Sequence, residues 1–469
     1  MAQHEIGMIG LGVMGRNLLL NMADHGFPVA GFDLDAAKVE ALRKESAGRS
    51  VHAAGSIEEL VRALRPPRAI VMLVPAGPPV DQVIRGLVPL LAPGDILMDG
   101  GNSHFTDTER RAEALGEKGI HLLGIGISGG EAGARHGPCI MPGGPADAYA
   151  AVRKIFEMVA AQADGPCCAY IGPRGAGHYV KMVHNGIEYA MLQCMAEIYD
   201  VLSTVLGLEA AEVSRVFARW NQGELGGYLV EIAAMCLARV DPDTRRPLVD
   251  VILDKAGQKG TGKWTSQSAL DLGVPTPTID LAVACRVLSD LKEERVAASK
   301  VIRGPRVRAP ARQAALAAAC RDALHVANAV CYAQGLALAR AASKAYGYDL
   351  KLDEIARIWR GGCIIRSKLL GPIAAACRKD PALPNLLVDK FFARLVSTRA
   401  RALRTVVSEA ARAGVPVLGL AGSLGYLDSY RRARLPQNLT QAQRDFFGAH
   451  TYQRIDKQGN FHTNWTQST

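Results

Sequence analysis

The sequence predicts an α/β domain with a parallel sheet, followed by a large all-helical domain and a C-terminal tail. Residues 1–176 alternate short apolar runs with amphipathic helical patterns, which is typical of βαβ units. In residues 177–434 the strand-like runs stop and long helical patterns take their place. Residues 435–469 are polar and aromatic with little periodicity. We therefore expect three segments with these bounds.

The elements of the first two segments follow from their local patterns. Apolar runs at 6–9, 69–74 and 95–99 predict strands, and amphipathic stretches at 16–25 and 36–44 predict the helices between them. The segment 172–177 has the glycine and proline content of a turn and marks the domain boundary. Beyond it, helical patterns cover roughly 178–206 and 321–345.

Composition narrows the class of protein. Hydrophobic residues make up 49% and charged residues 21% of the 469 residues, as in an ordinary globular protein. The sequence contains neither an apolar run long enough to span a membrane nor a secretory signal, so we expect a cytoplasmic protein. The ten cysteines form no CxxC pair, which indicates free thiols and no metal site.

The net charge of +10 raises the question of an anionic partner. The charges are dispersed, and the densest basic stretch, 303–312, lacks the interleaved aromatic residues of a single-strand groove. We interpret that stretch as a solvated loop and expect neither a nucleic acid nor a membrane as partner. A small anionic substrate remains as the expected partner of the excess positive charge.

A glycine-rich loop follows the first predicted strand. Gly10, Gly12 and Gly15 form a GxGxxG pattern between that strand and a helix, which suits a tight turn that receives a pyrophosphate at the helix N-terminus. Asp33 follows at the distance of a carboxylate that accepts the adenosine ribose hydroxyls. The context favours a Rossmann-like dinucleotide-binding domain over a structural turn.

A second glycine pattern, GxxxxGK at 257–263, is a weaker signal. Trp264 occupies the position where a phosphate loop needs Ser or Thr for magnesium, and the pattern lies in the helical half. We therefore reject a triphosphate site, although the same lysines and glycines suit a monophosphate.

The most informative spacing lies in the first long helix. Lys181, His184, Asn185 and Glu188 fall at i, i+3, i+4 and i+7, on one helix face flanked by apolar residues. A solvated face is the common explanation of such a stripe. We favour a catalytic role for these residues, because the rest of the helix is apolar almost all round, which indicates that the helix is buried. A buried Lys and a buried Glu can exchange protons near neutral pH.

Two further clusters follow predicted strands. The residues at 99–103 (DGGNS) lie at a carboxyl edge where open α/β sheets bind ligands, and those at 126–131 (GISGGE) offer backbone N–H groups to a carboxylate. Each is equally well explained as a plain glycine turn.

Several motifs together resemble 6-phosphogluconate dehydrogenases, in order from residue 6 to about 454. They are GLGVMGRNLLLNMADHGF, GDILMDGGNS, ISGGEAGARHGPCIMPGG, GAGHYVKMVHNGIEY, LDKAGQKGTGKWT and LPQNLTQAQRDFFGAHTYQR. The resemblance implies oxidative decarboxylation of 6-phosphogluconate to ribulose 5-phosphate. It also implies a homodimer whose tail reaches into the site of the partner subunit.

The resemblance assigns roles residue by residue. It implies Lys181 as general base and Glu188 as general acid. The implied substrate contacts are Asn102, Ser128, Gly129, Gly130, His184, Asn185, Tyr189, Lys259, Arg286, Arg444 and His450, the last two acting in trans. The implied cofactor contacts are Gly10, Leu11, Gly12, Val13, Met14, Gly15, Asp33, Leu34, Asp35, Val74, Pro75, Ala76 and Asn102.

The sequence departs from the family pattern mainly at the cofactor. Ala132 replaces a Glu of SGGEEGAR, which leaves the catalytic residues untouched. Where NADP-dependent members carry Asn-Arg-Thr, this chain has Asp33-Leu34-Asp35, and Pro75 replaces a common Lys. Two carboxylates repel a 2′-phosphate, so we predict a preference for NAD. NADP is the weaker alternative, with Arg16 or Lys38 holding its phosphate.

Two other functions stay open at this stage. One is a β-hydroxyacid dehydrogenase that acts on a smaller, unphosphorylated acid, against which Glu188, Arg286 and the tail argue. The other is an inactive binding or scaffold protein on the same fold.

Overall fold

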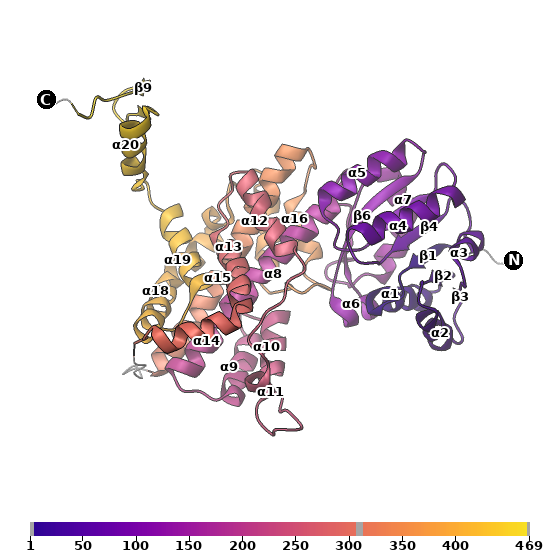
Figure 1. The fold of residues 1–469 in the computed structure, drawn as a ribbon, viewed down its shortest axis with the longest axis horizontal. Helices are drawn as coiled ribbons and strands as arrows, with labels where there is room; N and C mark the ends of the chain where they lie inside the picture. Colours follow the sequence, from indigo (N-terminus) through magenta and orange to yellow (C-terminus); the bar gives the residue numbers. More distant parts are fainter. Residues whose placement is uncertain (1–3, 306–312, 467–469) are drawn as a thin grey trace. The chain divides into compact units, whose positions relative to one another are not determined.

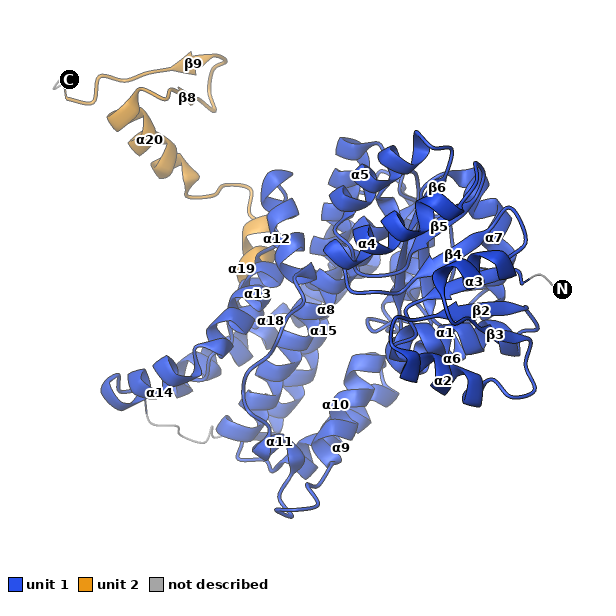
Figure 2. Cartoon of the chain, turned by 45° about the vertical axis from the view of Figure 1, so that its right-hand side comes forward, with its two compact units in different colours: residues 1–423 blue, residues 424–469 orange. Residues whose placement is uncertain are grey.

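The computed structural model describes residues 4–305 and 313–466, and the chain divides into two compact units, Met1–Ser423 and Leu424–Thr469 (Figure 2). The basic stretch at 303–312 therefore lies largely outside the described residues. Each unit is described by itself.

A seven-stranded sheet forms the N-terminal part of the first unit. Its strands run in the order β3-β2-β1-β4-β5-β6-β7, parallel except for β7, which is antiparallel to β6. The strands are β1 (Ile6–Ile9), β2 (Val29–Phe32), β3 (Val51–Ala53), β4 (Ala69–Met72), β5 (Ile96–Asp99), β6 (His121–Ser128) and β7 (Cys139–Gly143). The strand order reverses between β1 and β4, which is where such sheets bind ligands.

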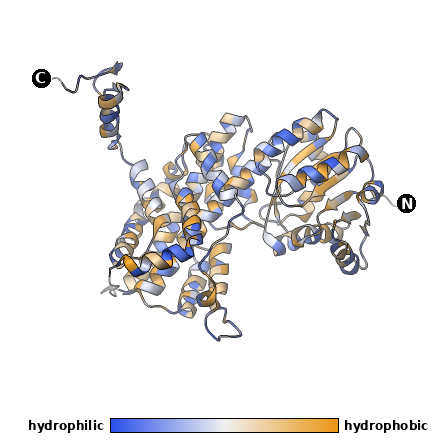
Figure 3. Cartoon of the chain, in the orientation of Figure 1, coloured by the Kyte–Doolittle hydropathy of each residue, from blue (hydrophilic) through white to orange (hydrophobic). Residues whose placement is uncertain are grey.

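Helices cover both faces of this sheet (Figure 1). One core cluster joins the sheet to α1 (Val13–Asp24), α2 (Ala36–Glu45), α6 (Gly130–His136) and α7 (Ala146–Val159). The other joins it to α3 (Ile57–Ala63), α4 (Pro78–Leu87) and α5 (Phe105–Gly116). Apolar residues are concentrated in the strands between the two helical layers, as Figure 3 shows.

The rest of the first unit is helical. It contains α8 (Ala176–Asp200), α9 (Ala210–Gln222), α10 (Tyr228–Ala238), α11 (Leu248–Val251), α12 (Thr261–Asp271), α13 (Pro277–Asp290), α14 (Lys292–Val301), α15 (Gln313–Tyr346), α16 (Leu352–Ile358), α17 (Leu370–Lys379) and α18 (Lys390–Ala413). Helix α8 is central, because it packs against β6 and β7 on one side and α12, α13 and α15 on the other. The predicted fold class, a Rossmann-like domain followed by an all-helical one, is confirmed.

Three sequence expectations need correction. The run at 126–131 does not simply follow a strand, because β6 continues through Ser128. Helix α1 begins at Val13, inside the glycine loop, so the phosphate-binding turn and the helix N-terminus are one structure. The long helix expected at 178–206 ends at Asp200 and continues as a π-helical turn over 201–205.

The second unit is more regular than its sequence suggests. The helix α19 (Leu418–Tyr430) leads into it, and α20 (Gln437–Gly448) and a short β8–β9 hairpin (Tyr452–Gln453, Asn460–Phe461) follow. Asp445, fully buried, accepts hydrogen bonds from Thr451 and Thr463 N–H and from the Trp465 indole. This carboxylate organises a segment that has little periodicity of its own.

The remaining compositional predictions can be compared with the structure. All ten cysteines are free thiols, as predicted. Within residues 4–305 and 313–466, no helix is long and apolar enough to cross a membrane. The same residues contain no group of three or more His, Cys, Asp or Glu side chains arranged to hold a metal ion.

Candidate active site

The glycine loop after β1 has the shape of a phosphate cradle. A Cβ at Gly10 would meet the Leu73 carbonyl oxygen at 2.5 Å, and one at Gly15 would meet the Gly10 carbonyl oxygen at 1.8 Å. A Cβ at Gly12, in contrast, has no neighbour within 4 Å. Two glycines thus permit tight packing and the third leaves an open backbone surface. Residues Leu11, Val13 and Met14 complete this loop and the first turn of α1, which fits a bound pyrophosphate.

Asp33 is tied to the glycine loop by its own carboxylate. Its Oδ2 accepts the Leu11 N–H at 2.7 Å, and its Oδ1 accepts the Asp35 N–H at 2.9 Å. The side chain of Asp33 is only 12% exposed. The carboxylate is therefore held at the end of β2, beside the loop, in one orientation. Spacing in the sequence suggested a ribose contact but did not reveal this bond to the loop.

The cations nearest to this edge are already paired. Lys38 Nζ lies 3.5 Å from Asp33 Oδ1 and 3.8 Å from Asp35 Oδ2, and Arg16 Nε lies 3.1 Å from Glu45 Oε2. Asp35 also caps α2 by accepting the Ala37 N–H at 3.0 Å. Leu34, at the expected adenine edge, is 93% exposed and contributes no charge. The edge therefore offers carboxylates, and Lys38 and Arg16 each lie within ion-pair distance of a carboxylate.

Two further loops leave the same edge of the sheet. Val74, Pro75 and Ala76 follow β4, and Asn102 lies in the loop after β5, where it is exposed. The loops are adjacent, since a Cβ at Gly101 would meet the Val74 carbonyl oxygen at 3.1 Å. The structure thus brings the loops after β1, β2, β4 and β5 to one edge.

Lys181 lies where α8 crosses β6. A Cβ at Gly126 would approach the Lys181 Cβ within 2.5 Å, so glycine at 126 allows helix and strand to pack in contact. Lys181 is 6% exposed. Desolvation lowers the pKa of its ammonium, while the Glu188 carboxylate partly opposes that shift. The predicted polar face is therefore buried rather than solvated.

Glu188 shows the opposite shift for the same reason. Burial raises the pKa of its carboxyl group, and the charges of Lys181 and Arg286 lower it by less. An amine whose pKa is lowered and a carboxyl group whose pKa is raised thus lie two helical turns apart. This is the electrostatic arrangement of a general base and a general acid.

His184 connects three elements through hydrogen bonds. Its Nε2 lies 3.3 Å from Ser128 Oγ, and its Nδ1 lies 3.1 Å from Asn185 Oδ1. Asn185 Nδ2 in turn donates to Thr261 Oγ1 at 3.2 Å. Burial, and then the Lys181 charge, hold the pKa of His184 well below its ordinary value. A neutral imidazole therefore fixes the end of β6 and the start of α12 against α8.

A stacked pair borders the acidic end of this face. The Arg286 guanidinium lies 3.4 Å above the Tyr189 ring, and its Nη1 donates to the Gly257 carbonyl at 3.1 Å. This bond holds the segment that carries Lys259, which is itself exposed. The residues of the rejected GxxxxGK motif thus lie beside the polar face instead of in a triphosphate loop.

A segment at 359–364 completes the site and was missed by sequence reasoning. Trp359 packs edge-on against His184 with ring centroids 5.6 Å apart, and the Ile364 N–H donates to Ser128 Oγ at 3.4 Å. A Cβ at Gly129 would lie 2.6 Å from the Gly362 carbonyl oxygen. Gly130 begins α6 and is exposed. The segment contains no sequence motif that would identify it as part of the site, because only tertiary packing brings it to Ser128.

The two tail residues belong to the second unit. Arg444 and His450 are both exposed there, and they flank the buried Asp445 in the sequence. Arg444 Nη1 donates to Gln441 Oε1 at 2.9 Å. Ala449 and Thr451, on either side of His450, both have positive φ values, 48° and 59°. The tail thus presents the Arg444 and His450 side chains to solvent, and the backbone around His450 is tightly turned.

Comparisons with known proteins agree along the whole chain. A family model for the NAD binding domain of 6-phosphogluconate dehydrogenase matches residues 5–172, and one for the C-terminal domain of 6-phosphogluconate dehydrogenase matches residues 177–465. The NADP(+)-dependent decarboxylating 6-phosphogluconate dehydrogenase of Bacillus subtilis is 52% identical over 467 residues, covering 99% of this chain and 100% of its own. The NAD(+)-dependent enzyme of the same organism is 49% identical over 466 residues, with the same coverage.

A solved structure gives the same result. The 6-phosphogluconate dehydrogenase of Plasmodium falciparum, described in its apo form and in complexes with NADP+ and with 6-phosphogluconate, superposes with a TM-score of 0.95. It is 41% identical, and the match covers 98% of this chain and 100% of that one.

Proposed function

Because the chain belongs to the 6-phosphogluconate dehydrogenase family, we propose that Lys181 and Glu188 transfer the protons in its reaction. That reaction is the oxidative decarboxylation of 6-phosphogluconate to ribulose 5-phosphate and carbon dioxide, with reduction of a nicotinamide cofactor. One observation carries the assignment. Two ionisable groups on one buried helix face have pKa values shifted in opposite directions, the amine downward and the carboxyl upward.

Lys181 begins the reaction as a neutral amine. Its lowered pKa allows it to take the proton from the 3-hydroxyl of the substrate. A bound nicotinamide cofactor would supply the acceptor for the hydride that leaves C3. The resulting 3-keto acid loses carbon dioxide once its carbonyl is polarised, and the newly protonated Lys181 stabilises the enolate oxygen that develops.

Glu188 completes the reaction by protonating C1 of the enediolate, which gives the ketone, and the proton held by Lys181 then returns to the Glu188 carboxylate. The two residues are seven positions apart, or ~10 Å along the helix axis, which suits opposite ends of a short carbon chain. Their charges are coupled, since a Lys181 ammonium lowers the pKa of Glu188. Proton uptake by Lys181 in the first step therefore prepares Glu188 to release its own proton in the last.

The surrounding polar groups match an anionic, hydroxylated substrate. 6-Phosphogluconate carries a carboxylate and a phosphate, which lysine, arginine and backbone N–H groups bind well. We propose as its contacts Asn102, Ser128, Gly129, Gly130, His184, Asn185, Tyr189, Lys259 and Arg286, together with Arg444 and His450 of the tail. The neutral His184 is suited to a hydroxyl and not to the phosphate.

The N-terminal domain binds a nicotinamide dinucleotide, and we propose that it prefers NAD over NADP. The support is the charge at the end of β2. Asp33 is held by two backbone N–H groups, Lys38 is engaged by carboxylates and Leu34 offers no charge. A 2′-phosphate would have to displace these contacts and approach a carboxylate. Relatives of both cofactor types share about half of the sequence, so overall identity does not decide the choice.

We also propose a homodimer whose tails act in trans. Large apolar side chains are exposed along the end of α13 and along α14, including Val287 at 50% and Val301 at 78%. The tail likewise exposes Phe446 at 60% and Phe447 at 73%. A second copy of the chain would bury such side chains and bring Arg444 and His450 to its partner's substrate.

The free thiols are also consistent with the cytoplasmic location expected from the sequence.

The proposal is tested by assaying the purified protein with 6-phosphogluconate and each nicotinamide cofactor. We expect cofactor reduction and release of carbon dioxide in equal amounts, with NAD the better cofactor. An unphosphorylated substrate such as gluconate is the control for the role of the phosphate. Absence of turnover with both cofactors would contradict the function, whereas faster turnover with NADP would contradict only the cofactor preference.

A further inference from the structure

A buried arginine joins the two loops to which the proposed function assigns cofactor contacts at 74–76 and 102. Arg111 lies on α5, and 3% of it is exposed. Its Nη2 donates to the Gly77 carbonyl at 3.0 Å, and its Nη1 donates to Ser103 Oγ at 3.3 Å. Gly77 directly follows the 74–76 loop, and Ser103 directly follows Asn102. One guanidinium therefore bonds to both loops at once.

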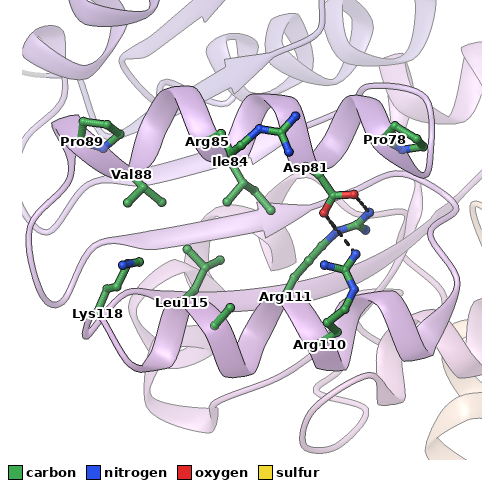
Figure 4. Close-up of a pocket in the computed structure, with 11 residues that line it drawn as sticks. Pro78, Asp81, Ile84, Arg85, Val88, Pro89, Arg110, Arg111, Leu115 and Lys118 are labelled. Atoms are coloured by element: carbon green, nitrogen blue, oxygen red, sulfur yellow. Dashed lines mark hydrogen bonds and ion pairs between the residues drawn. The ribbon is translucent and has the colours of Figure 1, made fainter.

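The guanidinium is itself held in place by acidic groups. Its Nε and Nη2 donate to the two carboxylate oxygens of Asp81 on α4, at 2.8 and 3.0 Å (Figure 4). Its Nη1 also lies 3.5 Å from Asp99 Oδ2, which accepts a hydrogen bond from Ser103 Oγ at 2.6 Å. The Arg111 guanidinium holds the pKa of Asp81 at about 2. The pair is thus fully charged at neutral pH.

We propose that Arg111 is a positioning residue for the nicotinamide cofactor, which sets the spacing between the 74–76 loop and Asn102. This inference rests on the proposed function, because it takes those loops to be the cofactor contacts. Only a planar group with several donors satisfies Asp81, Gly77 and Ser103 together. A lysine ammonium keeps the charge near Asp81 but has no fork to span the two loops. Arg111 would act through these loops and not by touching the cofactor itself.

The chain supplies a matched control. Arg110 is the adjacent residue on α5 and also pairs with Asp81, at 3.2 Å, but its side chain is 59% exposed. It forms ion pairs with Asp81 and Asp107, and neither belongs to the two loops. The same Arg-to-Lys change at 110 and at 111 therefore separates loss of an Asp81 ion pair from loss of the link between the loops.

The test measures NADH affinity by fluorescence titration, and steady-state KM for each substrate, in Arg111→Lys and Arg110→Lys. We expect Arg111→Lys to raise the NADH Kd and the cofactor KM by ~10-fold, as for loss of a charge-assisted hydrogen bond. The KM for 6-phosphogluconate should change less. We expect Arg110→Lys to stay within about twofold of wild type, as exposed ion pairs contribute little.

Two further variants separate positioning from folding. Ser103→Ala removes the link to the second loop while the Asp81 pair stays intact, and should weaken NADH binding by a smaller factor. Arg111→Ala should regain NADH affinity when guanidinium ion is added. The ion can reach the space left by the missing side chain, because Asp81 and Arg111 line a groove of about 540 Å³ between α4 and α5 (Figure 4).

The outcomes distinguish this inference from the proposed function. A wild-type protein that binds no nicotinamide cofactor contradicts the proposed function. If the wild type binds cofactor and folded Arg111→Lys binds NADH as tightly as Arg110→Lys does, the positioning role is wrong. A loss in Arg111→Ala that guanidinium does not restore, with Ser103→Ala unchanged, also contradicts it.

Discussion

The loop at the end of β2 and the polar face of α8 differ most in their exposure to solvent. Leu34 is 93% exposed, whereas Lys181 is 6% exposed and His184 fully buried. At the end of β2, the Asp33 carboxylate would act mainly by attracting or repelling a charged ligand that binds beside it. On the buried face, desolvation changes which groups carry protons at all. We therefore expect cofactor choice to depend on the sign of a few local charges, and proton transfer to depend on how completely α8 is packed.

The largest effect is expected where burial matters most. Lys181→Met keeps the volume of the buried side chain but removes the base, so turnover should fall by ~10² or more. NADH affinity should remain near the wild-type value, since the loop after β1 is untouched. Lys344→Met, an exposed lysine on α15, is the control. Near-normal turnover in Lys181→Met would refute the assignment of the base.

Glu188→Gln tests the coupling between the two buried groups. Loss of the general acid should lower steady-state turnover by roughly 10². In the wild type, Glu188 raises the pKa of Lys181 and so offsets part of its desolvation. Without that charge the pKa of Lys181 falls further. The rise of hydride-transfer rate with pH, which follows deprotonation of Lys181, should therefore move to lower pH.

That shift is measured from the pH dependence of the first turnover of NADH formation. Glu113→Gln, an exposed glutamate on α5, should leave the profile unchanged. A profile in Glu188→Gln that stays in place or moves to higher pH would show that the two charges are not coupled.

Substitutions at the end of β2 should have a smaller effect, and it should fall on cofactor preference instead of turnover. Losing a charge-assisted bond and adding a repulsion costs on the order of 2 to 4 kcal/mol. We therefore expect the wild type to favour NAD over NADP by at least ~10-fold in kcat/KM. Asp33→Asn combined with Leu34→Arg should shift the preference towards NADP without altering the pH profile of Lys181. Glu113→Gln, an exposed glutamate on α5 outside the proposed cofactor contacts, is the control. A wild type that prefers NADP would show this interpretation of Asp33 to be wrong.

The tail adds a third region, in which order depends on one buried carboxylate. Desolvation alone would raise the pKa of Asp445, but donors from His462, Thr463 and Trp465 hold it at about 2. Asp445→Asn replaces one of the two carboxylate oxygens by an amide nitrogen, which cannot accept the bonds from Thr451, next to His450, or from Thr463 and Trp465. We expect the KM for 6-phosphogluconate to rise by roughly three- to tenfold, as for loss of one hydrogen bond, with the NADH Kd unchanged. An unaltered KM would exclude a role of the turned tail in substrate binding.

Action of the tail in trans predicts the smallest signal. Lys181→Met subunits mixed with His450→Ala subunits should recover some activity, because one site in each hybrid then has both an intact base and an intact tail. Purified hybrids carrying two different tags allow the activity per dimer to be measured. Hybrids no more active than the mean of the two parent variants would contradict trans action.

Much of the cofactor half was predictable because its determinants are local. The strand at 6–9 has the predicted bounds, and glycines at 10 and 15 are required by contacts within a few residues or with the adjacent strand. The extension of β6 through Ser128 was not predictable from periodicity, because it is fixed by pairing with β7. Likewise, the helix α20 lies in a segment of weak periodicity, where Asp445 supplies order through residues that follow later in the chain.

The sequence by itself determined the order of domains, the dinucleotide loop and the one helix face that carries Lys181, His184, Asn185 and Glu188. These follow from spacing, since backbone geometry fixes which neighbours along a chain share a face or a turn. The burial of this face was inferred from its apolar surroundings in the sequence and is confirmed, whereas only the tertiary structure shows that Trp359 and Ile364 pack beside it and that Arg111 joins two loops. Burial and long-range hydrogen bonds arise between segments distant in the chain, and a pKa depends on that surrounding environment rather than on the residue's own neighbours in sequence.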